Sequence, residues 1–235
     1  MRLVRHPGKR GQAVRGGVAT IGNFDGVHQG HQAMLARLRT MARALDDGTA
    51  PVTVIGFEPH PRELLTPARA PGRITPFRDK TLALQRYGCE QFVCLAFGPA
   101  LAALDARSFI QRVLVESLGI RQLLIGDDFR FGAGRRGDYQ LLEQSGRLHG
   151  FGVERMPRFD LGGERVSSTR VRAALAAGDL PLAGQLLGRP YSLSGRVGNG
   201  DRIGRTLGFP TANVRLRQPP ALDGVLVADV RIDDR

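Results

Sequence analysis

Two histidines three residues apart, His28 and His31, are the residues of this sequence best suited to chemistry. They follow an apolar run at 18–21 and a glycine-containing segment at 22–26, and from Met34 onward apolar residues recur at spacings of three and four. This pattern predicts a strand, a solvent-facing turn and a helix, with the two imidazoles on one face of its first turn. Free backbone N–H groups and the helix dipole attract anions there, and glycine lets the backbone come close. The sequence therefore predicts a phosphate site.

Other kinds of site explain the pair less well. The chain contains no GxxxxGK[ST] pattern, which excludes a P-loop. Zinc could bind a His-x-x-His pair, but a structural zinc site normally has four ligands, and neither a cysteine nor a third ligand is nearby in the sequence. Two surface histidines at a helix cap are the remaining alternative.

Three further segments place polar residues beside predicted elements. Residues 58–63 (EPHPRE) contain two prolines, which predict a rigid loop rather than a helix. Residues 126–138 (GDDFRFGAGRRGD) predict a positive, ligand-facing loop, although a solvated run of charges has the same composition. Ser167, Ser168 and Thr169 precede an alanine-rich helix, where hydroxyls either bind an anion or simply cap the helix.

Strands and helices alternate over about the first 170 residues, which predicts a doubly wound parallel α/β sheet. Residues 64–75 are expected to be a mobile loop. The expected strands lie at 18–21, 52–57, 92–95, 122–125 and 152–156, and the helices after the first at 78–87, 106–118, 139–148 and 171–177.

The strings IGNFDGVHQGHQ, FEPHPRE, GDDFRFGAGRRGD and RVSSTRVR resemble, in this order, the motif blocks of the bacterial bifunctional riboflavin kinase/FMN adenylyltransferases, or FAD synthetases. The HxGH turn is the signature of nucleotidyltransferases that bind ATP phosphates through two histidines. The resemblance implies the HxGH nucleotidyltransferase fold and transfer of AMP from Mg-ATP to FMN. It assigns catalysis to His28, His31, Asn23, Asp25 and Arg172, ATP binding to Gly22, Phe24, Asp127, Ser167, Ser168 and Thr169, and flavin binding to Phe57, His60, Pro61, Phe129 and Arg130.

The composition changes near residues 188–190, and short runs between glycines then indicate an all-β domain, with strand-like runs at 191–197 and 225–232. Residues 204–213 resemble the GxxxGFPTAN block of riboflavin kinases, which hold Mg-ATP on a small β-barrel. The resemblance assigns Mg-ATP to Gly208, Pro210, Thr211 and Asn213, with Thr211 and Asn213 on Mg²⁺ and, on a strand, on the same side.

We therefore expect an FMN adenylyltransferase domain at 1–187 and the first part of a riboflavin kinase barrel at 188–235. The 47 residues from Arg189 to Arg235 are too few to close a barrel, and no glutamate after Glu164 can match the family's general base. We expect a chain truncated within the kinase domain, which converts FMN to FAD but not riboflavin to FMN.

The net charge of +12 raises the possibility of nucleic-acid binding, but only Lys9 and Lys80 are lysines and no basic stripe carries aromatic residues, so none is expected. No apolar run reaches about 18 residues, so no membrane span is expected. Cys89 and Cys94 are expected to be buried hydrophobes, and the protein to be cytoplasmic and a monomer or weak oligomer. Alternative functions are adenylyl transfer to nicotinamide mononucleotide or phosphopantetheine, and a basic nucleic-acid binder.

Overall fold

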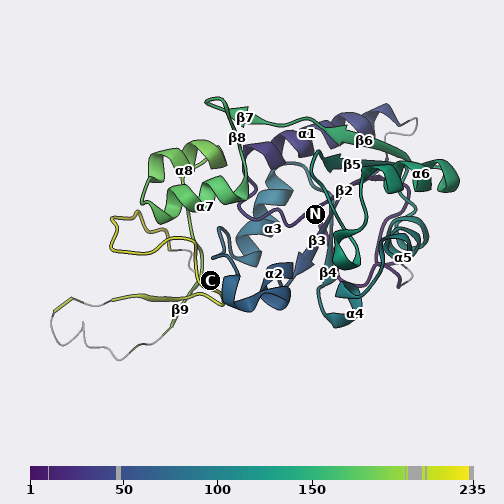
Figure 1. Cartoon of the computed structure of the whole chain (residues 1–235). Coiled ribbons are helices and arrows are strands. Elements are labelled where there is room, and N and C mark those ends of the chain that lie inside the picture. Colours follow the sequence, from purple (N-terminus) through teal and green to yellow (C-terminus); the bar gives the residue numbers. More distant parts are fainter. Residues whose placement is uncertain (10, 46–48, 199, 201–207, 210, 233–235) are drawn as a thin grey trace.

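Six parallel strands form the central sheet of the computed structural model, which describes all residues except 10, 46–48, 199, 201–207, 210 and 233–235. Their spatial order is β1-β4-β3-β2-β5-β6 (Figure 1). The strands are β1 (Arg2–Val4), β2 (Val18–Ile21), β3 (Val52–Glu58), β4 (Gln91–Ala96), β5 (Gln122–Gly126) and β6 (Gly152–Met156). The predicted α/β fold with a parallel sheet is confirmed.

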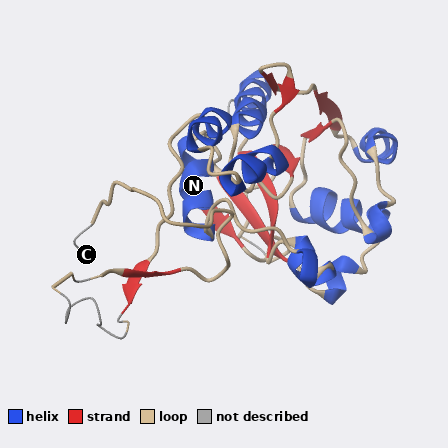
Figure 2. Cartoon of the chain, turned by 60° about the vertical axis from the view of Figure 1, so that its left-hand side comes forward, coloured by secondary structure: helices blue, strands red, loops and turns tan. Residues whose placement is uncertain are grey.

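Helices cover both faces of the sheet, and Figure 2 shows them on either side of the strands. Val54 of β3 packs in one apolar cluster with Leu35 and Leu38. Ile55, the next residue, packs in a second cluster with Phe109. Because successive strand residues point to opposite faces, each face has its own core. The helices are α1 (Gln29–Ala44), α2 (Pro61–Leu65), α3 (Phe77–Arg86), α4 (Pro99–Ala102), α5 (Ala106–Phe109), α6 (Tyr139–His149), α7 (Ser168–Ala176) and α8 (Leu180–Leu187), with the shorter or irregular turns η1 (Pro67–Arg69), η2 (Ile110–Ser117, π-helical) and η3 (Ala133–Arg135).

The sheet reverses its strand order at β2. From this strand the chain adds β3 and β4 on one side, and later β5 and β6 on the other, so Val18 pairs with Val52 and with Gln122. Ligands of open parallel sheets bind beyond the carboxyl ends of the strands at such a reversal. Residues 22–28, the histidine turn, follow β2, and the loop at 126–138 follows β5, so both lie at this edge.

Several local predictions are wrong. Residues 58–63 are not only a loop, because α2 begins at Pro61. Proline fits the first helical position, where its missing N–H is not needed, and Nδ1 of His60 accepts the backbone N–H of Arg62 at 3.1 Å. The expected loop at 64–75 contains the end of α2 and η1, and α7 begins at Ser168. The short strand β1 and helix α8 are not predicted by the sequence pattern.

The described part of 188–235 does not confirm the expected incomplete barrel. It contains one antiparallel pair, β9 (Arg196–Gly198) and β10 (Asn213–Arg215); the other antiparallel pair, β7 (Asp160–Leu161) with β8 (Glu164–Arg165), precedes α7. The run at 225–232 has the composition of a strand but forms none, and Val225 and Val227 are exposed. A strand is stable only with a neighbour to pair with, and no strand lies beside this run among the described residues.

Candidate active site

A cavity of about 270 Å³ lies where β2, β5 and β6 end and where α1 and α7 begin. This is the switch point of the sheet, where parallel α/β sheets bind ligands. The sequence-predicted site residues that line it are Gly22, Phe24, His28, His31, Asp127, Phe129, Ser167 and Ser168. Outside its lining are Asn23, Asp25, Thr169, Arg172, Phe57, His60, Pro61 and Arg130.

The two imidazoles stack on one another at this cavity. His28 is the N-cap of α1 and His31 lies in the first turn, so the ring centroids are 3.7 Å apart. The ring of Phe24 lies 4.5 Å from that of His31. Nδ1 of His28 accepts the backbone N–H of His31 at 3.4 Å. A neutral imidazole that accepts at Nδ1 carries its proton on Nε2, so His28 can donate one hydrogen bond to a ligand.

Both imidazoles are neutral at pH 7. Burial, and then the charge of Arg165, lower the pKa of His28 to about 4. Burial, and then His28, lower the pKa of His31 well below its usual range. His28 is only 6% exposed and His31 is half-buried, so the expectation of a solvent-facing turn is wrong for His28. The rings can therefore act on a phosphate as hydrogen-bond donors rather than as cations.

The turn that carries the histidines is held in an unfavourable backbone conformation. Phe24 has φ 50° and Val27 has φ 42°, and Gly26 between them has φ 85°. A left-handed conformation costs a residue with a Cβ about 1–3 kcal/mol, and a β-branched valine adopts it rarely. Burial of the Phe24 and Val27 side chains in the core holds the turn. In the described part of the chain, Oδ1 of Asn23 is buried here without a hydrogen-bond partner.

Asp25 anchors this turn to a distant loop. Its carboxylate accepts the backbone N–H groups of Ile74 and Thr75, both at 3.1 Å, and a 2.5 Å hydrogen bond from Nη2 of Arg172. Nε of Arg172 donates to the carbonyl of Gly72 at 2.8 Å. The structure thus joins Asp25 and Arg172 beside the cavity. The contact between Arg172 and a triphosphate stays a prediction.

Arg165 and Asp128 line the cavity although the sequence pattern assigned neither a role. Nη1 and Nη2 of Arg165 donate to the two carboxylate oxygens of Asp128, both at 2.9 Å, and Nη2 lies 3.2 Å from Asp127. The hydrogen bonds from Arg165 lower the pKa of Asp128. The sequence contains a signal for this ion pair. Two acids, Asp127 and Asp128, follow one strand, and Arg165 precedes the hydroxyl-rich start of a helix.

The residues predicted to bind flavin at the end of β3 and directly after it do not line the cavity, and β3 lies on the other side of β2 from β5. Phe57 meets Phe97 edge-on, with ring centroids 5.8 Å apart. His60 is buried, and burial, followed by the charge of Arg73, lowers its pKa to about 4. Pro61 begins α2. These residues form a second, adjacent part of the same sheet edge.

The residues after β5 that the sequence predicts to bind flavin are divided between the cavity and the surface. Phe129 lines the cavity and stacks on Phe131, with ring centroids 5.6 Å apart. Nη1 of Arg130 lies 3.3 Å from a carboxylate oxygen of Asp138, and its side chain is half exposed. Only Phe129 of this pair therefore meets the cavity.

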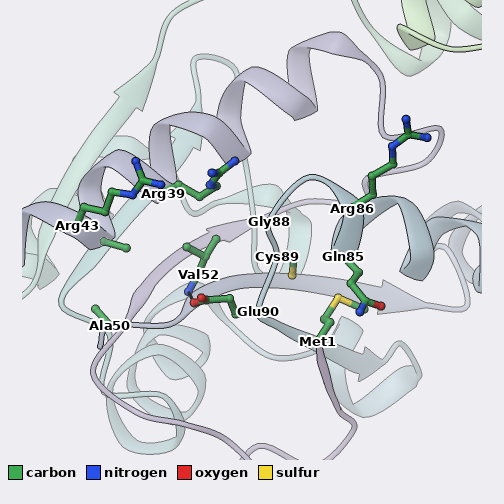
Figure 3. A pocket seen from close by; sticks show the side chains of 11 residues that line it. Met1, Arg39, Arg43, Ala50, Val52, Gln85, Arg86, Gly88, Cys89 and Glu90 are labelled. Atoms are coloured by element: carbon green, nitrogen blue, oxygen red, sulfur yellow. Dashed lines mark hydrogen bonds between the residues drawn. The ribbon is translucent and has the colours of Figure 1, made fainter. Parts of the chain in front are cut away.

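A larger hollow of about 620 Å³ lies at the opposite edge of the sheet, where β3 and β4 begin (Figure 3). Arg39 and Arg43 of α1 and Arg86 of α3 line it. Its acid, Glu90, accepts the backbone N–H of Val52 at 2.8 Å. Among the described residues that line it, none is a histidine, a serine or a threonine. The smaller cavity, at the carboxyl ends of the strands, is therefore the candidate active site.

The described residues of the kinase motif line neither of the two cavities. Asn213 begins β10 but Thr211 precedes it, so the expected shared strand face is wrong for Thr211. Both residues are exposed, Gly208 has φ 79°, and Pro210 lies outside the described residues. The described residues contain no group of three or more His, Cys, Asp or Glu side chains that could hold a metal ion. The roles of these residues stay predictions.

A parallel sheet with a His-x-Gly-His turn at its switch point defines an α/β protein of the nucleotidyltransferase type. The family model described as FAD synthetase matches residues 11–170, and the model described as riboflavin kinase matches residues 187–235. The chain belongs to the FAD synthetase family.

Named relatives agree with this assignment. The bifunctional riboflavin kinase/FMN adenylyltransferase of Pseudomonas fluorescens is 49% identical over 99% of this chain and 74% of its own length. The protein of the same description from Escherichia coli (strain K12) is 47% identical over 98% of this chain and 73% of its own. A crystal structure described as a macrolide-efflux protein from Streptococcus pneumoniae superposes with a TM-score of 0.78 at 27% identity, covering 94% of this chain and 71% of that one. Within the described residues, no helix is both long and apolar enough to cross a membrane.

Proposed function

We propose that this chain transfers AMP from Mg-ATP to the phosphate of FMN, forming FAD and releasing pyrophosphate. The observation that supports it most directly is the stacked, neutral pair of His28 and His31 in the switch-point cavity, between the starts of two helices. The relatives that are 47–49% identical are described as FMN adenylyltransferases and riboflavin kinases. This activity therefore agrees with both the site and the family.

In the proposed reaction an oxygen of the FMN phosphate attacks the α-phosphorus of ATP. A new P–O bond forms, the bond between the α-phosphorus and the bridging oxygen breaks, and pyrophosphate leaves with that electron pair. The FMN phosphate is already an anion, so no residue needs to remove a proton. Catalysis then comes from positioning and from donors aimed at the charge that develops on the phosphate oxygens. Nε2–H of His28 is one such donor, and an N–H of His31 is the second.

We assign the remaining residues by their place around the cavity. Ser167 and Ser168 at the start of α7, with Thr169 and Arg172, would hold the triphosphate, and Asp127 would lie near the nucleoside. Ser167 already accepts the backbone N–H of Arg170, so part of its role is to cap the helix.

The flavin is assigned to the edge between β3 and the loop after β5. Phe57, His60, Pro61, Phe129 and Arg130 would contact it there. Phe57 and Phe129 offer rings for the isoalloxazine, and Arg130 a positive charge. Asn23, whose Oδ1 is buried without a hydrogen-bond partner among the described residues, would contact the substrate that binds beside the histidine turn.

For residues 188–235 we propose the first part of a riboflavin kinase barrel, with 1–187 as the adenylyltransferase domain. Gly208, Pro210, Thr211 and Asn213 would belong to its Mg-ATP site. This chain spans about three-quarters of the length of the curated relatives that it matches.

A direct comparison of acceptors tests the proposed substrate. The chain is supplied with Mg-ATP and one acceptor at a time, and pyrophosphate release is measured. We expect release with FMN at least about 10²-fold faster than with nicotinamide mononucleotide or phosphopantetheine, because a site that fits one acceptor leaves its polar groups unpaired with another. Faster release with either alternative would assign the chain to that acceptor instead.

A further inference from the structure

Arg189 contacts the histidine turn from outside the cavity. It lies two residues after the end of α8, at the junction between the two proposed domains. Its Nη2 donates to the carbonyl of Gly26 at 2.7 Å, and its Nη1 lies 3.4 Å from the carbonyl of Val27 and 3.2 Å from that of Leu187. One guanidinium therefore connects the end of α8 to the peptide that immediately precedes His28.

A second side chain supports the same peptide. Nε2 of Gln32 donates to the carbonyl of Val27 at 2.9 Å and to the carbonyl of Leu187 at 2.7 Å. Nε2 of Gln29 donates to the carbonyl of Gln185 at 2.5 Å. The start of α1 and the end of α8 are thus fastened side by side (Figure 1).

The peptide that these donors hold is the strained one. Val27 is β-branched, fully buried and at φ 42°, a backbone conformation that its own side chain disfavours. Such a conformation persists only where several contacts with the surrounding structure hold it in place. Val27 is followed by His28, so the orientation of this peptide sets where the imidazole of His28 lies. Without its outside donors, the turn is free to relax toward an ordinary backbone conformation and to carry the ring with it.

Arg189 is itself held in place. Gly188 ends α8 at φ 66°, and a Cβ built on it would meet Cγ of Gln29 at 3.3 Å. Pro190 follows and fixes the backbone on the other side. The guanidinium is half-buried, and its five donors in a rigid fork suit two carbonyl groups that lie side by side.

We propose that Arg189 is a positioning residue for adenylyl transfer, whose guanidinium holds the Gly26 and Val27 carbonyls and thereby places His28 against the reacting phosphate. This role rests on the proposed function. It also makes the adenylylation site depend on a residue beyond the last helix of the proposed adenylyltransferase domain.

The test is Arg189→Ala in the full chain, assayed as FAD formation from FMN and Mg-ATP. We expect kcat to fall about 10–10²-fold, the cost of a misplaced catalytic group, while KM for ATP and for FMN changes little because the substrate contacts remain. Millimolar guanidinium ion should restore part of kcat in this variant but not in His28→Ala. The matched control is Arg15→Ala, since Arg15 also donates to two backbone carbonyls, those of Val115 and Glu116, and it does not line the cavity.

Arg189→Lys covers the case in which the alanine variant does not fold. A single ammonium cannot match both carbonyl directions, so we expect kcat between those of wild type and Arg189→Ala. A folded Arg189→Ala or Arg189→Lys with the kcat of wild type would overturn the proposal.

Failure of the proposed function would be visible separately, as a wild-type chain that forms no FAD. In that event the positioning role is tested by the NMR chemical shift of the Cε1–H proton of His28. It should shift in the folded Arg189 variant and stay in place in Arg15→Ala, and an unshifted resonance would overturn the positioning role.

Discussion

At the scale of single residues, the absence of charge on His28 and His31 follows from their burial. Two stacked imidazoles whose ring centroids are 3.7 Å apart could not both be protonated without strong repulsion, and the buried ring of His28 meets little water that could relieve it. A neutral ring still donates one hydrogen bond, which is the interaction that a developing negative charge on a phosphate needs. The chemistry of the pair is therefore set by packing as much as by residue type.

Removal of either imidazole should reduce adenylyl transfer. We expect kcat for FAD formation to fall about 10²–10³-fold in His28→Ala and in His31→Ala, as on loss of an oxyanion donor. His28→Ala also removes the N-cap contact of α1, so it should lower the free energy of unfolding by about 1 kcal/mol. His149→Ala, at the exposed end of α6, is the control. Near-normal turnover in both cavity variants would remove the central assignment.

Burial of His28 also predicts how stability depends on pH. The folded pKa of about 4 lies below the unfolded value of 6.5, so the unfolded chain binds the proton first as the pH falls. Above pH 6.5 the free energy of unfolding contains the full contribution of the neutral His28. As the pH falls from 6.5 to 4, the free energy of unfolding decreases by about 3 kcal/mol because of this one group. Chemical denaturation of wild type and His28→Gln between pH 4 and 8 measures it. Equal pH slopes for the two proteins would contradict the neutral, buried imidazole.

Arg172 offers a test of the triphosphate assignment. Lysine keeps the charge but cannot serve the carboxylate of Asp25, the carbonyl of Gly72 and a phosphate together. We expect Arg172→Lys to raise KM for ATP about tenfold, the loss of roughly one charge-assisted hydrogen bond, with little change in KM for FMN. Steady-state kinetics with each substrate varied gives the comparison, and equal effects on both would indicate a purely structural role.

At the scale of elements, the segment from Gly72 to Thr75 joins three parts of the molecule. Its backbone meets Asp25 and Arg172 beside the candidate active site. The N–H of Arg73 donates to the carbonyl of Pro219 at 2.9 Å, and the N–H of Ala221 donates to the carbonyl of Arg73 at 2.9 Å. The segment at 219–221 thus packs on the loop that supports the histidine turn.

This contact predicts that position 72 tolerates only glycine. A Cβ there would lie 2.6 Å from the carbonyl oxygen of Pro220 and 2.9 Å from Cα of Ala221. We expect Gly72→Ala to lower the free energy of unfolding by about 1–3 kcal/mol, as in other overpacked sites. Gly8→Ala is the control, since its Cβ would meet Ser117 Oγ at an ordinary 3.6 Å. Unfolding of Gly72→Ala at the denaturant concentration of wild type would refute the contact.

The elements were predictable from sequence where their pattern is local. The strand at 18–21 and the helix after it are apolar at the spacing that each element needs, and Asp138 caps α6 as its type suggests. The start of α2 was not predictable in this way. Two prolines favour a loop, and only the structure shows that His60 caps a helix there. The bounds of α7 depend in the same way on which hydroxyl, here Ser167, takes the cap.

At the scale of the whole molecule, the sequence indicated which residues gather at one sheet edge but not how they contact one another. That the motifs follow β2, β3 and β5 could be inferred, since parallel strands share their carboxyl ends. The stacking of the histidines, the pair formed by Arg165 and Asp128, and the contact of Arg189 with the turn all join distant segments, and no local pattern encodes such contacts. The predicted strand at 225–232 failed for a related reason, because strand composition does not supply a neighbouring strand.

The central claim is that this cavity moves the AMP group of ATP to FMN, and a labelled phosphorus follows that group directly. The purified chain is incubated with FMN and Mg-ATP labelled at the α-phosphorus, and the products are separated by chromatography. The account predicts that the label appears in FAD, that unlabelled pyrophosphate forms in equal amount, and that His31→Ala slows both together. Label retained in ADP, or transfer of the terminal phosphate instead, would contradict it.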